Sequence, residues 1–144
     1  MIKLLKPWTD NYIELPFKHN GRDRLGIDCW GLDKLVYREI LDIELPDYSG
    51  ALKDSSLETL NQLSELVKRE RPKWKEVKTP SEFDLVLLRI RGLAIHTGII
   101  APKREFLHIL EGINSTVEPL NSLMWRRRIV GYFRHIEAEN KGYF

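Results

Sequence analysis

The feature of this sequence that most constrains its fold is the order in which two hydrophobic patterns occur along it. Apolar residues recur at helical spacing in a segment that begins at Asp28 or Cys29 and in a second from about Ser56 to Arg71. From Phe83 onward the pattern changes to short runs rich in Val, Leu and Ile, which is typical of strands at 83–90, 94–100, 105–110 and 128–135. Helical segments followed by consecutive strands predict an α+β fold with an antiparallel sheet.

Length and charge limit the classes of function. The chain has 144 residues, the usual length of one domain, so we expect residues 1–144 to form a single domain. Lys and Arg number 23 and Asp and Glu number 21, which gives a formal net charge of +2. A dedicated nucleic-acid binder usually carries a strongly basic face, so this near balance argues against nucleic acid as a partner.

The hydropathy of the chain bears on its location. No apolar run approaches the roughly 18 residues that a membrane-spanning helix needs. The segment Met1–Trp8 has too short an apolar stretch for a secretory signal. We therefore expect a protein with no membrane span and no signal peptide that is made and kept in the cytoplasm, or exported by a route that the sequence does not encode.

Cys29 is the only cysteine in the chain, so an internal disulfide is excluded and the thiol is either buried filler or a working group. Its expected place in the first turn of a helix, after the N-cap residue Asp28, brings it close to free N–H groups and a partial positive charge that favour the thiolate. Gly26 and Gly31 leave the backbone around the sulfur unencumbered. We expect an accessible thiol with a pKa below the ~8.5 of a free cysteine.

Two histidines lie twelve residues apart in neighbouring predicted strands. A hairpin about Pro102 that pairs Ile100 with Arg104 also pairs His96 with His108, and this requires a loop of odd length. Directly opposed residues share a face of the sheet, with Cβ atoms about 4.5–5.5 Å apart. A lone strand histidine is more often a satisfied polar group than a catalyst, but a facing pair with a cysteine available at a helix start is harder to explain in that way.

These three residues fit acyl-transfer chemistry. Cys29 would attack a carbonyl carbon, His96 would accept and return the proton, and His108 would hold the His96 ring in one tautomer. The backbone N–H of Cys29 would supply part of an oxyanion hole. No cofactor is expected. A zinc site built from the same three residues is the weaker interpretation, because no close ligand pair of the usual kind is present, so no metal is expected.

The order and spacing of three motifs resembles the NlpC family of cell-wall cysteine endopeptidases. They are Asp-Cys-Trp-Gly-Leu at 28–32, His-Thr-Gly-Ile at 96–99, and His108. The resemblance covers roughly Tyr12 to Arg134, and segments 44–48 and 125–131 look most like the phage-tail branch of the family. It implies a papain-like fold, with the N-terminal catalytic helix packed on a central antiparallel sheet, and a triad of cysteine, histidine and a third polar residue.

The resemblance also implies a function. The expected reaction is cleavage of an amide bond in peptidoglycan stem peptides, by resemblance the bond between D-γ-glutamate and diaminopimelate. The phage-tail branch implies a role at the tail tip or in tail assembly, with tail proteins as partners and the virion as location. Two other interpretations stay open: a structural tail protein that turns over no substrate, and an amidase or acyltransferase that uses the same triad.

Departures from the family pattern concern the substrate cleft. The family often has a tyrosine where this chain has Phe17, an aromatic-Gly-Gly where it has His19-Asn20-Gly21, and Gly-Asp where it has Phe83-Asp84. The residues expected to line the cleft are Phe17, His19, Asp28, Trp30 and Gly31. His135, which lies near a polar C-terminus, is expected at the surface.

Overall fold

The computed structural model describes residues 6–48, 50, 54 and 56–143. A six-stranded antiparallel sheet has the order β3-β8-β4-β5-β6-β7. Its strands are β3 (Trp74–Val77), β4 (Leu85–Ile90), β5 (Leu93–Ala101), β6 (Glu105–His108), β7 (Thr116–Pro119) and β8 (Ile129–His135). The short strands β1 (Arg22–Asp23) and β2 (Gly26–Ile27) form a separate two-stranded ribbon.

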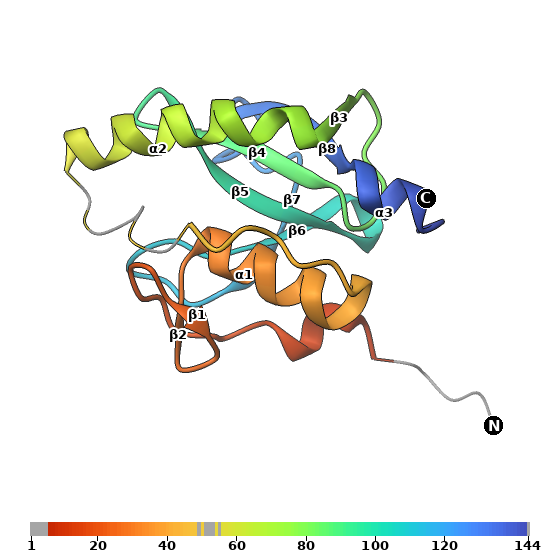
Figure 1. Ribbon diagram of the computed structural model, residues 1–144. Helices are drawn as coiled ribbons and strands as arrows, with labels where there is room; N and C mark the ends of the chain where they lie inside the picture. The colour runs from red at the N-terminus through yellow and green to blue at the C-terminus, as the bar shows by residue number, and fades with distance from the viewer. Residues whose placement is uncertain (1–5, 49, 51–53, 55, 144) are drawn as a thin grey trace.

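Two main helices accompany the sheet. Figure 1 shows α2 (Leu57–Glu70, yellow-green) above strands β4 and β5, and α1 (Cys29–Val36, orange) below them. A π turn, Tyr37–Leu41, continues α1, and the short α3 (Ile136–Asn140) follows the last strand. Within the described residues, no helix combines the length and the apolar character needed to cross a bilayer.

Both helices begin where the sequence predicts. Asp28 caps α1 by accepting a hydrogen bond from the backbone N–H of Gly31 at 2.8 Å, and Ser56 caps α2 by accepting one from Thr59 at 3.2 Å. Leu35 of α1 is buried in the core, whereas Leu57 at the start of α2 is largely exposed. The stability of α1 therefore depends on its packed face more than that of α2 does.

The sheet separates two hydrophobic clusters. On one face of β4, Leu85 and Leu87 belong to the larger cluster, which also contains Leu32, Leu35 and Val36 of α1. The alternate residues Val86 and Leu88 belong to the second cluster on the opposite face, together with Ile100, Phe106, Leu120 and Trp125. This division decides which side chains of β5 can meet α1.

The hairpin between β5 and β6 has the odd loop length that the sequence predicts, three residues, Pro102–Arg104. The predicted pairing of Ile100 with Arg104 is wrong, because Ile100 lies opposite Phe106. Lys103 and Arg104 adopt left-handed conformations, with φ of 64° and 56°, so both stay in the loop and the register moves by two residues. A two-residue shift keeps every side chain on its expected face.

The prediction of a surface position for His135 is wrong. Only 9% of this residue is exposed, and its ring centroid lies 4.7 Å from that of Trp74. Its Nδ1 accepts the backbone N–H of Glu137 at 3.2 Å and so caps α3. The rings of Tyr37 and Trp74 pack against that of His135, and these long-range contacts cannot be read from the composition of the C-terminal segment.

Candidate functional site

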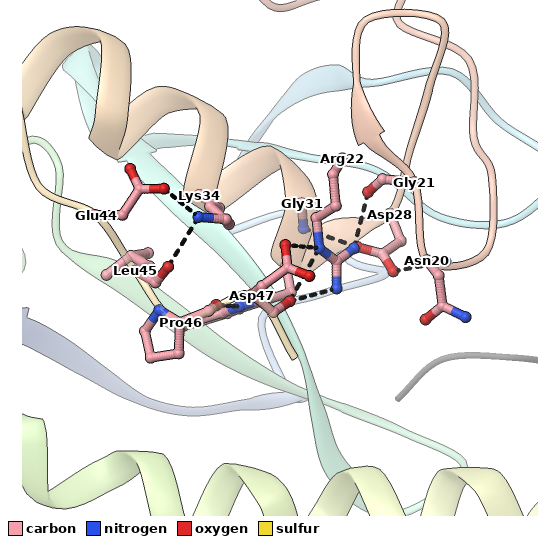
Figure 2. A network of polar contacts seen from close by, with 11 residues as sticks. Asn20, Gly21, Arg22, Asp28, Gly31, Lys34, Glu44, Leu45, Pro46 and Asp47 are labelled. Atoms are coloured by element: carbon pink, nitrogen blue, oxygen red, sulfur yellow. Dashed lines mark hydrogen bonds and ion pairs between the residues drawn. The ribbon is translucent and has the colours of Figure 1, made fainter. Parts of the chain in front are cut away.

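The turn that carries Cys29 is held by a buried carboxylate. Asp28 is 1% exposed, and besides Gly31 it accepts hydrogen bonds from Arg22 Nη1 at 2.8 Å and from the backbone N–H of Asn20 at 3.1 Å. Figure 2 shows Arg22 reaching on to the Asp47 segment, where Nε and Nη2 donate to the Asp47 carbonyl at 3.0 and 2.8 Å. The N-terminal loop, the start of α1 and the segment after α1 are therefore fixed to one another.

Gly31 is required by a close approach of backbone. A Cβ atom at this position would lie 2.2 Å from the carbonyl oxygen of Gly21, far inside van der Waals contact. The first turn of α1 can pack on the preceding loop only because this side chain is missing. Gly31 thus acts on the site by holding the Cys29 turn in place.

Cys29 borders a cavity of about 100 Å³ between α1, α2 and the sheet. Its lining is mainly apolar, with Leu63, Leu66 and Val67 from α2 and Leu85, Leu87, Ile95 and Phe133 from the sheet. Of the residues expected to line a cleft, Asp28 and Trp30 border this cavity. Phe17, His19 and Gly31 are not among the described residues that line it. The ring of Phe17 instead contacts that of His19, with centroids 5.0 Å apart.

The surroundings of Cys29 oppose ionisation of its thiol. Burial raises the pKa of Cys29 to about 12, and the nearby carboxyl groups of Asp28 and Asp33 act in the same direction. Hydrogen bonding by Thr97 acts the other way but does not offset them. The residue as a whole is partly exposed, yet the predicted low pKa is wrong for this state. The helix N-terminus is present as expected, but desolvation and two carboxyl groups outweigh it.

Asp33, which sequence reasoning missed, lies one turn after Cys29 on α1 and is fully buried. Its Oδ2 accepts a hydrogen bond from the hydroxyl of Thr97. Its Oδ1 has no hydrogen-bond partner within the described part of the chain. Burial, with a contribution from Asp28, raises the pKa of Asp33 well above its ordinary value. A carboxyl group four residues after the cysteine, on the apolar side of the helix, was the available signal.

The side chains of the two histidines meet, although the observed register places them two residues out of the direct opposition that the sequence predicts. His96 Nε2 lies 2.9 Å from His108 Nδ1, and His108 Nε2 contacts Oε2 of Glu118, a residue that sequence reasoning also missed. His96 is 2% exposed and His108 is fully buried. Burial lowers the pKa of His96 well below its ordinary value, and the neighbouring His108 adds to this effect. Burial also lowers the pKa of His108, against the opposing influence of Glu118.

The cysteine and the histidine pair lie on opposite faces of the sheet. Thr97 points toward α1, where it bonds Asp33, and successive side chains of a strand alternate between faces. His96 therefore points the other way, where its ring lies 5.5 Å from that of Trp125, centroid to centroid. Among the described residues, no hydrogen bond joins Cys29 to His96. The structure brings His96 and His108 together and does not bring them to Cys29.

An irregularity in the sheet lies next to His96. Leu88 pairs with His96 and Arg89 pairs with Ala94, so Ile95 is an extra residue on β5. Such β-bulges bend a strand and re-aim side chains, and they are frequent next to active sites. His96 therefore lies at the point where the register between β4 and β5 changes.

The NlpC/P60 family model matches residues 14–134. No curated protein matches significantly. Among solved structures, the chain is similar to the NlpC/p60 domain of the peptidoglycan hydrolase SagA, with 16% identity, a TM-score of 0.58 and coverage of 89% of this chain and 92% of that one.

Two longer proteins of known structure are also similar. One is an NLP/P60 family protein from Staphylococcus aureus, described as similar to lipoprotein, with 21% identity, a TM-score of 0.62 and coverage of 88% of this chain and 38% of that one. The other is an NlpC/P60 family protein from Bacillus cereus, with 17% identity, a TM-score of 0.65 and coverage of 88% and 37%. At this identity the likenesses show the fold, and they confirm the α+β architecture that the sequence predicts.

Proposed function

Because the chain belongs to the NlpC/P60 family, we propose that it is a cysteine hydrolase that cleaves an amide bond in the peptide part of peptidoglycan. The observation that carries this proposal is the position of Cys29, in the first turn of α1 and on the wall of a cavity beside the sheet. The solved relative SagA is named a peptidoglycan hydrolase, which supports the substrate class. The proposed scissile bond is the one between D-γ-glutamate and diaminopimelate.

The proposed reaction begins with attack of the Cys29 thiolate on the carbonyl carbon and ends with release of the acyl group to water. His96 is the proposed group that takes the thiol proton and returns it to the leaving amine, with His108 as its partner. This transfer requires a proton-accepting nitrogen of His96 within reach of the Cys29 thiol.

The test is hydrolysis of purified muropeptides that contain the proposed bond. The wild-type protein should release the two expected fragments, identified by mass, and Cys29→Ala should release none because no other group can form the acyl-enzyme. His96→Ala should be nearly as damaging and His108→Ala milder. Thermal unfolding of each variant separates lost chemistry from lost folding. Equal turnover by the wild type and Cys29→Ala would exclude the mechanism.

A second candidate function is a structural protein that keeps the fold without turnover. Two observations favour it: the raised pKa of the Cys29 thiol, and the position of the histidine pair on the other face of the sheet. This candidate predicts a folded wild-type protein that cleaves no muropeptide at any pH. An amidase or acyltransferase with the same residues would be recognised by its products.

The proposed biological setting is a phage tail, either at its tip or during its assembly. The support is the likeness of segments 44–48 and 125–131 to the phage-tail branch of the family. Mass spectrometry of purified virions from a host that expresses the gene should detect the chain in the tail fraction. Detection only in the cytosol of infected cells would argue for an assembly role, and expression independent of any phage would contradict both roles.

A further inference from the structure

Glu118 is the end of a chain of side chains on the face of the sheet opposite Cys29. Its Oε2 atom accepts a hydrogen bond from the indole Nε1 of Trp125 at 3.0 Å and also contacts Nε2 of His108. The other ring nitrogen of His108, Nδ1, lies 2.9 Å from Nε2 of His96. The side chain of Glu118 is 29% exposed, so the chain runs from the protein surface to the buried His96.

The protons of this chain can be arranged in two ways. A neutral imidazole has one N–H donor and one acceptor nitrogen. If Glu118 is a carboxylate, His108 donates from Nε2, so its Nδ1 must accept from the Nε2–H of His96. If Glu118 is protonated, both contacts reverse, and His96 then carries its proton on Nδ1. Which ring nitrogen of His96 is free to accept a proton therefore depends on Glu118.

Trp125 decides between the two arrangements. An indole N–H only donates, so the Glu118 oxygen that it contacts must accept. An oxygen that accepts from the indole can also accept from the Nε2–H of His108, whereas an acid O–H on the same atom would have to donate to His108 beside the indole N–H. The first arrangement follows, in which His96 carries its proton on Nε2. No hydrogen bond of the described residues uses Nδ1 of His96, so this atom keeps its lone pair.

We propose that Glu118 is a positioning residue that holds His108 and His96 both as Nε2–H tautomers and so makes Nδ1 of His96 the proton-accepting atom of the pair. The assignment of a catalytic role to that atom rests on the proposed function, whereas the tautomers themselves do not. Sequence gives no sign of this role, since Glu118 is one of 21 acidic residues and lies on a short strand that the hydrophobic pattern does not predict.

The carboxylate has a second effect on the pair. Its hydrogen bond and its charge both raise the pKa of His108, against the larger lowering by burial. Removal of the charge in Glu118→Gln should therefore lower the pKa of His108 further. The amide oxygen of glutamine can still accept from Nε2–H, so this variant should keep more of the tautomer preference than Glu118→Ala does.

The test is ¹⁵N NMR of the histidine side chains in the full chain, assigned by triple-resonance experiments, in wild type, Glu118→Gln and Glu118→Ala. Wild type should show His96 and His108 with protonated Nε2 and bare Nδ1 near pH 7.5. Glu118→Ala should give a tautomer mixture for His108, and Glu118→Gln an intermediate spectrum. Glu105→Gln is the matched control, because Glu105 pairs with Pro119 on the same two strands and no hydrogen bond or ion pair of the described residues joins it to His96 or His108.

A kinetic experiment on muropeptides tests the proposed role of His96 Nδ1 in catalysis. Glu118→Ala should lower kcat at least about tenfold with KM little changed, because a wrong tautomer removes the base without removing substrate contacts. A wild-type spectrum dominated by Nδ1–H tautomers, or spectra unchanged in Glu118→Ala, would overturn the proposal. If the wild type cleaves nothing yet the spectra behave as expected, the proposed function fails and the tautomer assignment stands.

Discussion

At the scale of single residues, Cys29 has a buried acidic neighbour, Asp33, that the proposed reaction does not use. Asp33 adds a fully buried carboxyl group whose Oδ1 has no hydrogen-bond partner among the described residues. A buried carboxyl group of this kind favours its neutral form, because the charged form loses its hydration. Asp33 therefore makes the folded state bind a proton that the unfolded chain releases at neutral pH.

This imbalance predicts the pH dependence of stability. The pKa of Asp33 is raised in the folded state, so its stabilising proton is present at low pH and its contribution is lost as pH rises through the folded-state value. Asp33→Asn removes that titration and still offers Thr97 an oxygen acceptor. Between pH 4 and pH 8 the variant should gain at least about 1 kcal/mol in unfolding free energy relative to wild type. Urea denaturation at several pH values measures this difference.

A difference that stays constant with pH would mean that Asp33 does not titrate in the folded protein. Asp28→Asn serves as a comparison, because Asp28 accepts hydrogen bonds from Arg22 and two backbone N–H groups. Its replacement should destabilise the protein instead, since the donors lose a charged acceptor.

At the scale of elements, strand β5 is the part of the molecule on which the chemistry depends. It presents Thr97 to α1 and His96 to the Trp125 side. Whether the His96 ring reaches Cys29 in the working protein decides between the enzyme and the structural protein.

Disulfide trapping tests the orientation of β5 relative to Cys29. Two cysteines cross-link only when their Cα atoms lie within about 7 Å and their Cβ atoms face each other. In the register of this structure, Thr97→Cys should cross-link to Cys29 under mild oxidation and His96→Cys should not. Cross-linking of His96→Cys in place of Thr97→Cys would contradict this orientation of β5. Intact mass before and after reduction gives the yield.

The elements themselves were largely predictable from the sequence. Both main helices and four of the strands follow from apolar spacing and from caps such as Asp28 and Ser56. Strands β3 and β7 were missed because they are short and only partly buried. The exact register of the β5–β6 hairpin depends on the left-handed conformation of Arg104, and the register of β4 with β5 beside His96 depends on the bulge at Ile95. Neither residue type signals these conformations.

The residues of the candidate site were easier to predict from the sequence than their arrangement in space. The contact of His96 with His108 survived the error in register because a shift of two residues preserves the face. The prediction of a low pKa for the Cys29 thiol was wrong, because the sequence shows the helix N-terminus but not the burial of the thiol or of the nearby Asp33. Long-range packing, which sets dielectric surroundings and strand faces, carries the missing information.

At the scale of the whole molecule, Glu70, the last residue of α2, links this helix to the segment after α1 and to strand β3. It is 6% exposed, and its carboxylate accepts hydrogen bonds from the hydroxyl of Tyr48 and from Nε1 of Trp74 at 2.9 Å. Lys73 Nζ lies 3.3 Å from the same group. Helix α2, which forms one wall of the cavity beside Cys29, is thus held to the edge strand β3 and to the segment after α1.

Replacement of Glu70 should weaken the attachment of α2 and lower the stability of the protein. Glu70→Ala leaves buried donors without an acceptor, which costs about 1–3 kcal/mol of unfolding free energy, and Tm should fall by roughly 2–4 °C per kcal/mol. Glu65→Ala is the control, because Glu65 is exposed on the same helix and its ion pair among the described residues is with Lys68, at 3.1 Å. It should change stability by less than about 0.5 kcal/mol. Equal effects of the two substitutions in calorimetry would show that Glu70 does not fasten α2.

The position of Trp125 gives the molecule an optical signal. Its indole ring is 1% exposed and lies 5.5 Å from the ring of His96 and 5.2 Å from that of His108, centroid to centroid. A charged imidazolium quenches the fluorescence of an adjacent indole, whereas a neutral imidazole does so far less. Acidification that protonates the pair should therefore dim one of the four tryptophans in the chain. The emission of a single buried ring would then report, in real time, the charge of a histidine pair that no solvent-exposed dye can reach.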